Sequence, residues 1–225
     1  MDDPKKIIIA LDYDHIDYAL ALSDKVNPEL CRLKIGKELF TKYGPHIVRD
    51  IQNKGFDIFL DLKFHDIPTT VYKACLSALS LNIWMLNVHL SGGVDMVKAA
   101  MKAKKHSETS TKLIGVSVLT SLSDNDCLKI YGCSRHEELQ RLKHIAAESE
   151  VDGFVCSPYD INTLKDPSKI YVTPGIRISN DKQDHHKAAK PREAIDLGAD
   201  YLVIGRSVTN SESPNTILEE IIETL

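Results

Sequence analysis

Two lysines and three acidic residues lie at or just after the ends of apolar, strand-like segments: Asp12, Lys34, Asp61, Lys63 and Asp66. Because side chains alternate along a strand, Asp61 and Lys63 share one face and Leu62 takes the other. The carboxyl ends of neighbouring parallel strands meet at one edge of a sheet, where ligands bind. Fixed charges gathered there can stabilise a charge that develops during a reaction. The pattern therefore indicates an electrostatic catalytic site.

A structural network of ion pairs is the alternative interpretation of these charges, since such networks are common in proteins without any catalytic role. Against it, the burial of charged groups costs free energy unless they are fully paired. Helix surfaces offer less costly places for structural pairs. The concentration of charges at strand ends therefore favours a functional site.

Eight short apolar segments recur at intervals of roughly 20 to 40 residues. They are Ile7–Leu11, Arg32–Ile35, Ile58–Leu62, Met85–His89, Leu113–Leu119, Gly153–Cys156, Tyr171–Thr173 and Tyr201–Ile204. Apolar residues between them follow the three- and four-residue spacing of amphipathic helices. Strands alternating with helices predict a parallel sheet with right-handed crossovers. Eight units predict one (β/α)8 TIM barrel over residues 1–225. An open doubly wound sheet is the alternative, but no GxGxxG follows the first strand.

Residues typical of helix boundaries support this assignment of strands and helices. Ser134 and Glu137 have the spacing of a capping box, and Pro191 suits a first helical turn. Gly55 and Gly198 each follow a helical pattern and precede a strand, as glycines after a helix end do.

Charge and cysteine content narrow the function classes. The 225 residues include 28 Lys+Arg and 32 Asp+Glu, a net charge of -4, which argues against general nucleic-acid binding. The five cysteines lack CxxC spacing, so neither a zinc site nor a disulfide framework is predicted. The N-terminal region lacks a signal-peptide pattern, and polar residues interrupt the longest apolar stretch. We expect a cytoplasmic protein without nucleic-acid or membrane partners.

The segment Asp61–Thr70, DLKFHDIPTT, resembles the DxKxxDIPxT signature of the orotidine 5'-phosphate decarboxylase family. The resemblance extends to ALD, LKIG, NVH, VLTS, TPGIR and ADYLVIGR at other strand ends, and so covers essentially the whole chain. It implies decarboxylation of orotidine 5'-phosphate to uridine 5'-phosphate and CO2, the last step of de novo pyrimidine nucleotide synthesis. It also implies a homodimer with shared active sites and no cofactor.

The resemblance gives each charged residue a role. Lys63 would stabilise the carbanion at C6 of the pyrimidine and protonate it, while Asp61 would lie beside the substrate carboxylate. Lys34 would bind the ribose and order the charges, and Asp66 would complete an alternating array from the second subunit. Without an electron-sink cofactor, such preorganised charges must stabilise the carbanion. Further substrate contacts are implied for Asp12, Ile67, Thr70 and Thr120, with Thr70 reaching the neighbouring subunit's site.

The loops after the last two predicted strands form phosphate sites in many α/β barrels. Here they carry Pro174 with Arg177, and Gly205 with Arg206. Glycine permits close backbone approach and arginine supplies a bidentate fork. A turn glycine beside a surface arginine would be the structural interpretation of either loop alone. By resemblance Gln183 joins this site, although the segment between Arg177 and Gln183 is shorter than in the family pattern.

Two other functions are compatible with parts of this pattern. Metal-dependent relatives share DxKxxD but act on sugar phosphates, as decarboxylases or aldolases, with a glutamate on the second strand that serves magnesium. This chain has Lys34 there, and a lysine repels a metal ion, so we expect no metal. A catalytically silent, nucleotide-binding barrel is the other rival, which the presence of Lys63 and Asp66 disfavours. Asn87 and His89 share one strand face and suit either a structural hydrogen bond or a substrate contact.

Overall fold

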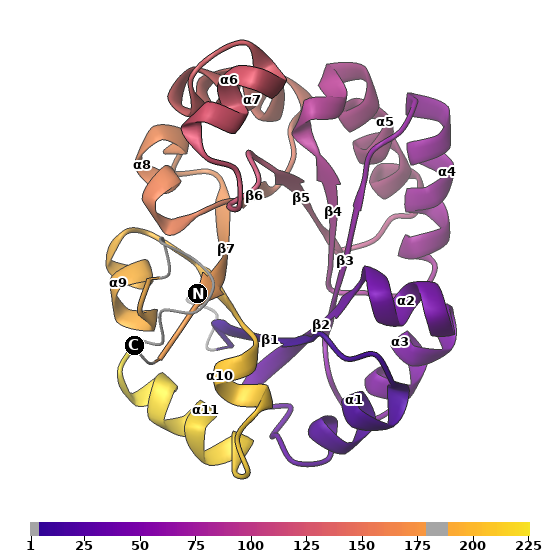
Figure 1. Ribbon diagram of the computed structural model, residues 1–225. Coiled ribbons are helices and arrows are strands. Elements are labelled where there is room, and N and C mark those ends of the chain that lie inside the picture. The colour runs from indigo at the N-terminus through magenta and orange to yellow at the C-terminus, as the bar shows by residue number, and fades with distance from the viewer. Residues whose placement is uncertain (1–4, 179–188) are drawn as a thin grey trace.

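Eight parallel strands close into a barrel in chain order, β1 to β8 (Figure 1). The computed structural model describes residues 5–178 and 189–225. The strands are β1 (Ile7–Leu11), β2 (Cys31–Gly36), β3 (Ile58–Phe64), β4 (Met85–His89), β5 (Lys112–Val116), β6 (Gly153–Val155), β7 (Ile170–Ile176) and β8 (Tyr201–Ile204). The TIM barrel and all eight predicted strands are thus confirmed. Some ends differ: β5 stops at Val116 instead of Leu119, and β7 continues to Ile176.

Helices surround the barrel and connect successive strands (Figure 1). They are α1 (Ile16–Ser23), α2 (Lys37–Tyr43), α3 (Pro45–Gln52), α4 (Pro68–Leu79), α5 (Gly93–His106), α6 (Asp124–Tyr131), α7 (Arg135–Ser149), α8 (Ile161–Leu164), α9 (Pro191–Asp196), α10 (Arg206–Thr209) and α11 (Pro214–Glu223), with 3-10 turns η1 (Leu90–Gly92) and η2 (Pro158–Asp160). None of these helices has the length and apolar character needed to cross a membrane.

The predicted helix boundaries are present. Ser134 and Glu137 form the capping box of α7, and Pro191 is the first residue of α9. Gly198 follows α9 with a φ of 106°, and Gly55 follows α3 with a φ of 92°. Glycine adopts these conformations without the steric cost that other residues incur.

Side-chain alternation divides the core into two layers. Leu33 and Ile35 of β2 pack with the cluster between barrel and helices, whereas Arg32 and Lys34 alternate with them and point inward. The barrel interior is filled by Ile8, Ala10, Phe59, Met85, Ile114, Val116, Val155, Val172, Tyr201 and Val203. Below this layer the Arg32 guanidinium lies 4.0 Å from the Trp84 ring centroid. The barrel interior at this level is therefore packed with side chains, as is typical of the TIM barrel.

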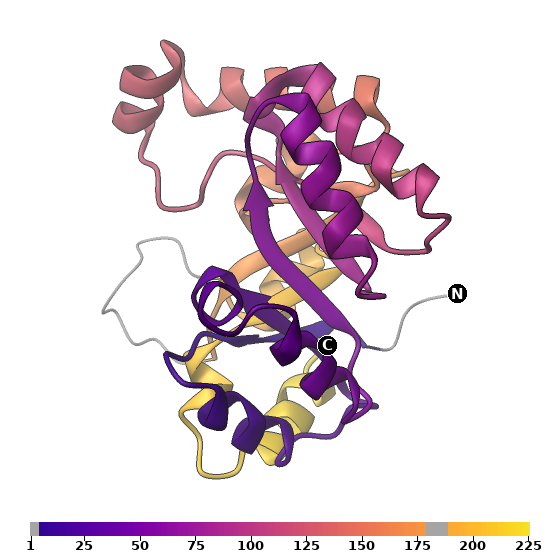
Figure 2. The same cartoon turned by 90° about the vertical axis from the view of Figure 1, so that its right-hand side faces the viewer.

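The same alternation, continued towards the carboxyl ends of β1 to β4, places polar residues above the apolar layer. Asp12 follows Ala10, Asp61 follows Phe59, and Asn87 follows Met85, each two residues further along. In the side view, β3 (purple) rises from the lower right to an arrowhead that marks its carboxyl end (Figure 2). This end is the mouth, where barrel enzymes bind substrates.

Strand β3 departs from regular geometry near the mouth. Its pairing with β4 shifts register between Leu60 and Phe64, and Lys63 has a φ of 52°. Asp61 and Lys63 were predicted to share one face because side chains alternate along a regular strand. That simple alternation does not describe the irregular segment observed here. A residue held in such a sparsely populated conformation costs about 1–3 kcal/mol and persists only where surrounding contacts impose it.

Candidate active site

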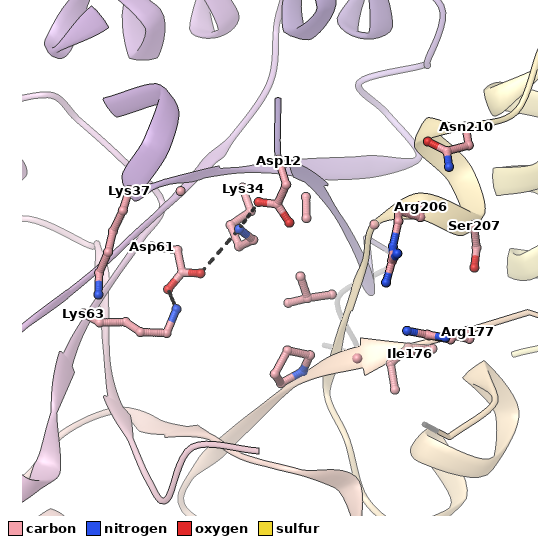
Figure 3. Close-up of a pocket in the computed structure, with 16 residues that line it drawn as sticks. Asp12, Lys34, Lys37, Asp61, Lys63, Ile176, Arg177, Arg206, Ser207 and Asn210 are labelled. Atoms are coloured by element: carbon pink, nitrogen blue, oxygen red, sulfur yellow. Dashed lines mark hydrogen bonds and ion pairs between the residues drawn. The ribbon is translucent and has the colours of Figure 1, made fainter. Parts of the chain in front are cut away.

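One cavity of about 1000 Å³ opens at the mouth of the barrel. That volume is at the upper end of the range for small-molecule sites. Eight of the residues expected to bind substrate or act on it line the cavity: Asp12, Lys34, Asp61, Lys63, Pro174, Arg177, Gly205 and Arg206. In Figure 3 the charges of β1 to β3 lie on one side of the cavity and the two arginines on the other.

Four charged side chains form an alternating row on the first side of the cavity. Lys34 Nζ lies 3.0 Å from Asp12 Oδ1 and 3.4 Å from Asp61 Oδ2. The other oxygen of Asp61 accepts a hydrogen bond from Lys63 Nζ. The row therefore runs Asp12–Lys34–Asp61–Lys63 (Figure 3). Asp12 was predicted to contact the substrate, whereas its ion pair with Lys34 was not predicted.

Burial and pairing together fix the charge states in this row. The side chains of Lys34 and Asp61 are only 9% and 11% exposed. Burial, the largest influence, would lower the pKa of Lys34, but the carboxylates of Asp61 and Asp12 hold that pKa above its ordinary value. Burial would likewise raise the pKa of Asp61, yet the ammonium groups of Lys34 and Lys63 hold it below its ordinary value. Lys34 and Asp61 are thus both charged at neutral pH.

A pair of histidines lies beside the row. The rings of His65 and His89 are 5.3 Å apart between centroids. Burial, followed by the charges of His65, Lys37 and Lys63, lowers the pKa of His89 to about 4. His89 is therefore neutral at neutral pH and adds no positive charge to the site.

The opposite side of the cavity is formed by the ends of β7 and β8. Pro174 and Arg177 belong to the first, and Gly205 and Arg206 to the second. Gly175 has a φ of 79°, and the pairing of β7 with β8 shifts register between Thr173 and Ile176. This irregular strand end lets both Pro174 and Arg177 line the cavity.

Other predicted residues are not brought to this cavity within the chain. Asp66, Ile67 and Thr70 are exposed at the start of α4, and Thr120 is exposed in the loop after β5. None of the four belongs to the cavity lining. The Asp66 carboxylate instead accepts a hydrogen bond from the Ile67 amide, at 2.6 Å. Gln183 lies outside the described residues.

Some lining residues were missed by the sequence analysis, notably Lys37, Ile176, Ser207 and Asn210. Lys37 is the first residue of α2, directly after β2, so the strand-end argument could have found it. Ser207 and Asn210 depend on the short helix α10 and its C-cap, for which the sequence gives no distinct signal.

The carboxylates of the cavity are engaged by lysine. Asp12 and Asp61 both contact Lys34 Nζ, so an ammonium group occupies the space between them. Over residues 5–178 and 189–225, no three His, Cys, Asp or Glu side chains are grouped as metal ligands would be.

Comparison with known proteins assigns the family. The orotidine 5'-phosphate decarboxylase / HUMPS family matches residues 5–221. The chain belongs to this family. A protein of Saccharophagus degradans named orotidine 5'-phosphate decarboxylase is 49% identical, over 97% of this chain and 94% of the relative. The protein of that name from Shewanella sediminis is 46% identical, over 98% of this chain and 97% of the relative.

A solved structure shares the architecture. The crystal structure of orotidine 5'-phosphate decarboxylase from Lactobacillus acidophilus superposes with a TM-score of 0.85 at 32% identity, covering 98% of each chain. Together with the curated relatives, this makes the chain an enzyme of the decarboxylase family, a carboxy-lyase on a TIM barrel.

Proposed function

We propose that this enzyme converts orotidine 5'-phosphate to uridine 5'-phosphate and CO2, without metal or organic cofactor, in pyrimidine nucleotide synthesis. One observation carries the proposal: an alternating row of paired charges, with Lys34 and Asp61 buried at its centre, faces two arginines across one cavity. The substrate is anionic at both ends, with a carboxylate on C6 and a phosphate on the ribose. Its carboxylate would lie near Lys63, and its phosphate between Arg177 and Arg206.

The proposed reaction breaks the bond between C6 and the carboxyl carbon, and both electrons of that bond remain on C6. The Lys63 ammonium stabilises this carbanion and transfers a proton to C6, which leaves a neutral amine that solvent reprotonates. Asp61 lies next to the departing carboxylate and, with Lys34, orients the ammonium. Since these charges are already paired in the structure, little reorganisation is needed during the reaction.

The phosphate contacts supply binding energy away from the reacting atoms. Arginine binds phosphate through two parallel hydrogen bonds, so Arg206 and Arg177 suit this task. Energy from such remote contacts can hold the reactive geometry at C6 and thereby raise kcat as well as affinity. We assign Gln183 and Thr120 to the same bound state, as further substrate contacts.

We further propose a homodimer whose two sites are shared. Asp66 is exposed and lies outside its own chain's cavity, and Ile67 beside it is 66% exposed. A second subunit would cover this apolar side chain and take Asp66, Ile67 and Thr70 into its site. The row would then continue as Asp12–Lys34–Asp61–Lys63–Asp66. The five free, buried cysteines suit a reducing compartment, and we place the enzyme in the cytoplasm.

Sugar-phosphate chemistry is the main rival, because the matched family also includes HUMPS enzymes. Two observations favour the nucleotide substrate. The curated relatives at 46–49% identity named above are orotidine 5'-phosphate decarboxylases. In addition, Lys34 separates the two cavity carboxylates that a metal ion would otherwise bridge.

The change in ultraviolet absorbance of the pyrimidine ring, as orotidine 5'-phosphate loses its C6 carboxylate, tests the proposal. We expect the wild-type enzyme to convert orotidine 5'-phosphate and to show no activity on 3-keto-gulonate 6-phosphate. Loss of a general acid alone costs roughly 10²–10⁴-fold, and Lys63→Ala also removes the charge that stabilises the carbanion, so its loss should be larger. Uridine 5'-phosphate should still bind to this variant. A Lys63→Ala rate within tenfold of wild type would exclude the proposed mechanism.

A further inference from the structure

Asn87 is a polar side chain buried at the base of the charged row. It lies on β4, points into the barrel above Met85, and is 0% exposed. It is not among the residues that line the cavity, so a bound substrate would not reach it directly. Buried amides need hydrogen-bond partners for both of their ends, and the identity of those partners indicates what the residue does.

Both ends of the Asn87 amide bind the two residues assigned to the chemistry. Its Nδ2 donates to Asp61 Oδ1 at 2.7 Å, the same oxygen that accepts from Lys63 Nζ. Its Oδ1 accepts from the backbone N–H of Lys63 at 2.8 Å. One side chain therefore ties the carboxylate of Asp61 to the backbone of Lys63.

The backbone at this point is the irregular one. Lys63 has a φ of 52°, and the β3–β4 pairing shifts register between Leu60 and Phe64. The regular hydrogen bonding between β3 and β4 is thus interrupted at Lys63. Its backbone N–H donates instead to the side chain of Asn87. Lys63 thus combines a left-handed backbone, an N–H that donates to Asn87, and an ammonium group that contacts Asp61.

We propose that Asn87 is a positioning residue, which sets the Lys63 ammonium and the Asp61 carboxylate relative to each other and to C6 of the substrate. The inference rests on the proposed function of this site and extends it to a residue beneath the cavity. The site needs an acceptor for the Lys63 N–H and a donor to the Asp61 carboxylate, and the amide of Asn87 provides both. Aspartate would keep the acceptor but repel Asp61, and leucine would leave the Lys63 N–H without this partner.

The test compares Asn87→Leu with wild type. The variant keeps the approximate shape of asparagine and removes both hydrogen bonds. Misplacement of a catalytic group by about 1 Å costs on the order of 100-fold in rate, so kcat on orotidine 5'-phosphate should fall by about that factor. The phosphate contacts are untouched, so KM should stay within about threefold of wild type.

A binding measurement separates positioning from stability. The probe is 6-hydroxyuridine 5'-phosphate, which carries an anionic oxygen on C6 and depends on a well-placed Lys63 ammonium. Its Kd should rise at least roughly 30-fold in Asn87→Leu, while the Kd of uridine 5'-phosphate changes by less than about threefold. This ratio can be measured even in a chain without decarboxylase activity, so failure of the proposed function and failure of this inference are distinguishable.

Thr173→Val is the matched control. Thr173 lies on β7, is 0% exposed, and donates from Oγ1 to the Tyr201 carbonyl at 3.3 Å. This substitution also removes one buried hydrogen bond, but outside the cavity lining, so kcat and both Kd values should stay within about twofold of wild type. Thermal melts of both variants show whether they are similarly destabilised.

Asn87→Asp provides a second test should the leucine variant not fold. It keeps the shape and the acceptor for Lys63, but places a second carboxylate beside Asp61, so kcat should fall by at least about 100-fold. Folded Asn87 variants with wild-type kcat and an unchanged ratio of the two Kd values would overturn the proposal. Failure of both variants to fold would overturn it too, because the hydrogen bonds of Asn87 would then hold the barrel itself.

Discussion

Complementation between two inactive variants tests whether Asp66 serves the neighbouring subunit. Lys63 lines the cavity of its own chain, whereas Asp66, three residues later, is exposed outside that cavity. In a twofold dimer, each site would take Lys63 from one chain and Asp66 from the other. Homodimers of Lys63→Ala and homodimers of Asp66→Asn should therefore both be nearly inactive.

The recovered activity follows from the geometry. A dimer that combines one chain of each variant has one site with both defects and one site with neither. Random exchange at equal concentration gives about half mixed dimers, and one of their two sites is intact, so about a quarter of wild-type activity should return. If both residues served the same chain's site, every site in the mixture would keep one defect and no activity would return.

The assay unfolds the two variants together, refolds them, and follows the decrease in pyrimidine absorbance. Different affinity tags on the two chains allow mixed dimers to be isolated and counted. As a control, each variant is refolded alone and should stay inactive. If mixed dimers are confirmed and no activity returns, the shared-site account is refuted, and Asp66 acts in the active site of its own chain.

Three further predictions concern the phosphate site, acid stability and barrel packing. Arg206→Ala should lower kcat/KM for the nucleotide by about 10- to 150-fold, the equivalent of about 1.5–3 kcal/mol, through loss of charge-assisted hydrogen bonds. Exposed Arg49→Ala on α3 is the control, and an equal loss with orotidine lacking the phosphate would contradict the assignment. His89→Gln should reduce the loss of stability as the pH falls from 6.5 to about 4, because the folded protein holds the pKa of His89 below its unfolded value. The difference should be about 1 kcal/mol, since partial exposure screens the full effect, and urea melts at both pH values measure it. Gly153→Ala should destabilise the barrel by about 1–3 kcal/mol and lower the Tm by roughly 2–12 °C, because a Cβ there would lie 2.1 Å from the Ile170 carbonyl oxygen. An unchanged Tm would show that strands β6 and β7 can separate without cost.

The fold was predictable because its signals are local and repeated. Apolar segments alternate with helical spacing through the chain, and boundary residues such as Ser134 and Pro191 mark helix starts. Strand ends were less predictable where backbone geometry depends on neighbours. β7 runs on through Gly175, whose φ of 79° is not typical of a regular strand and is not specified by the apolar pattern.

Eight of the residues that line the cavity were predictable, because parallel strands bring their carboxyl ends together whatever the sequence between them. The contacts between these residues could be identified only in the folded structure. The Asp12–Lys34 ion pair, the left-handed Lys63 and the bridge through Asn87 depend on distances between β1, β2, β3 and β4. For Asp66 the structure of one chain is not enough, since the site that we propose for it belongs to another subunit.

The most direct measurement of the central claim is a single turnover of orotidine 5'-phosphate by enzyme freed of metal ions by exhaustive chelation. Product analysis should show uridine 5'-phosphate and CO2 in equal amounts, at the same rate with and without the chelator. Loss of activity that added magnesium restores would contradict the account, and would move the chain to the metal-dependent sugar-phosphate branch of its family.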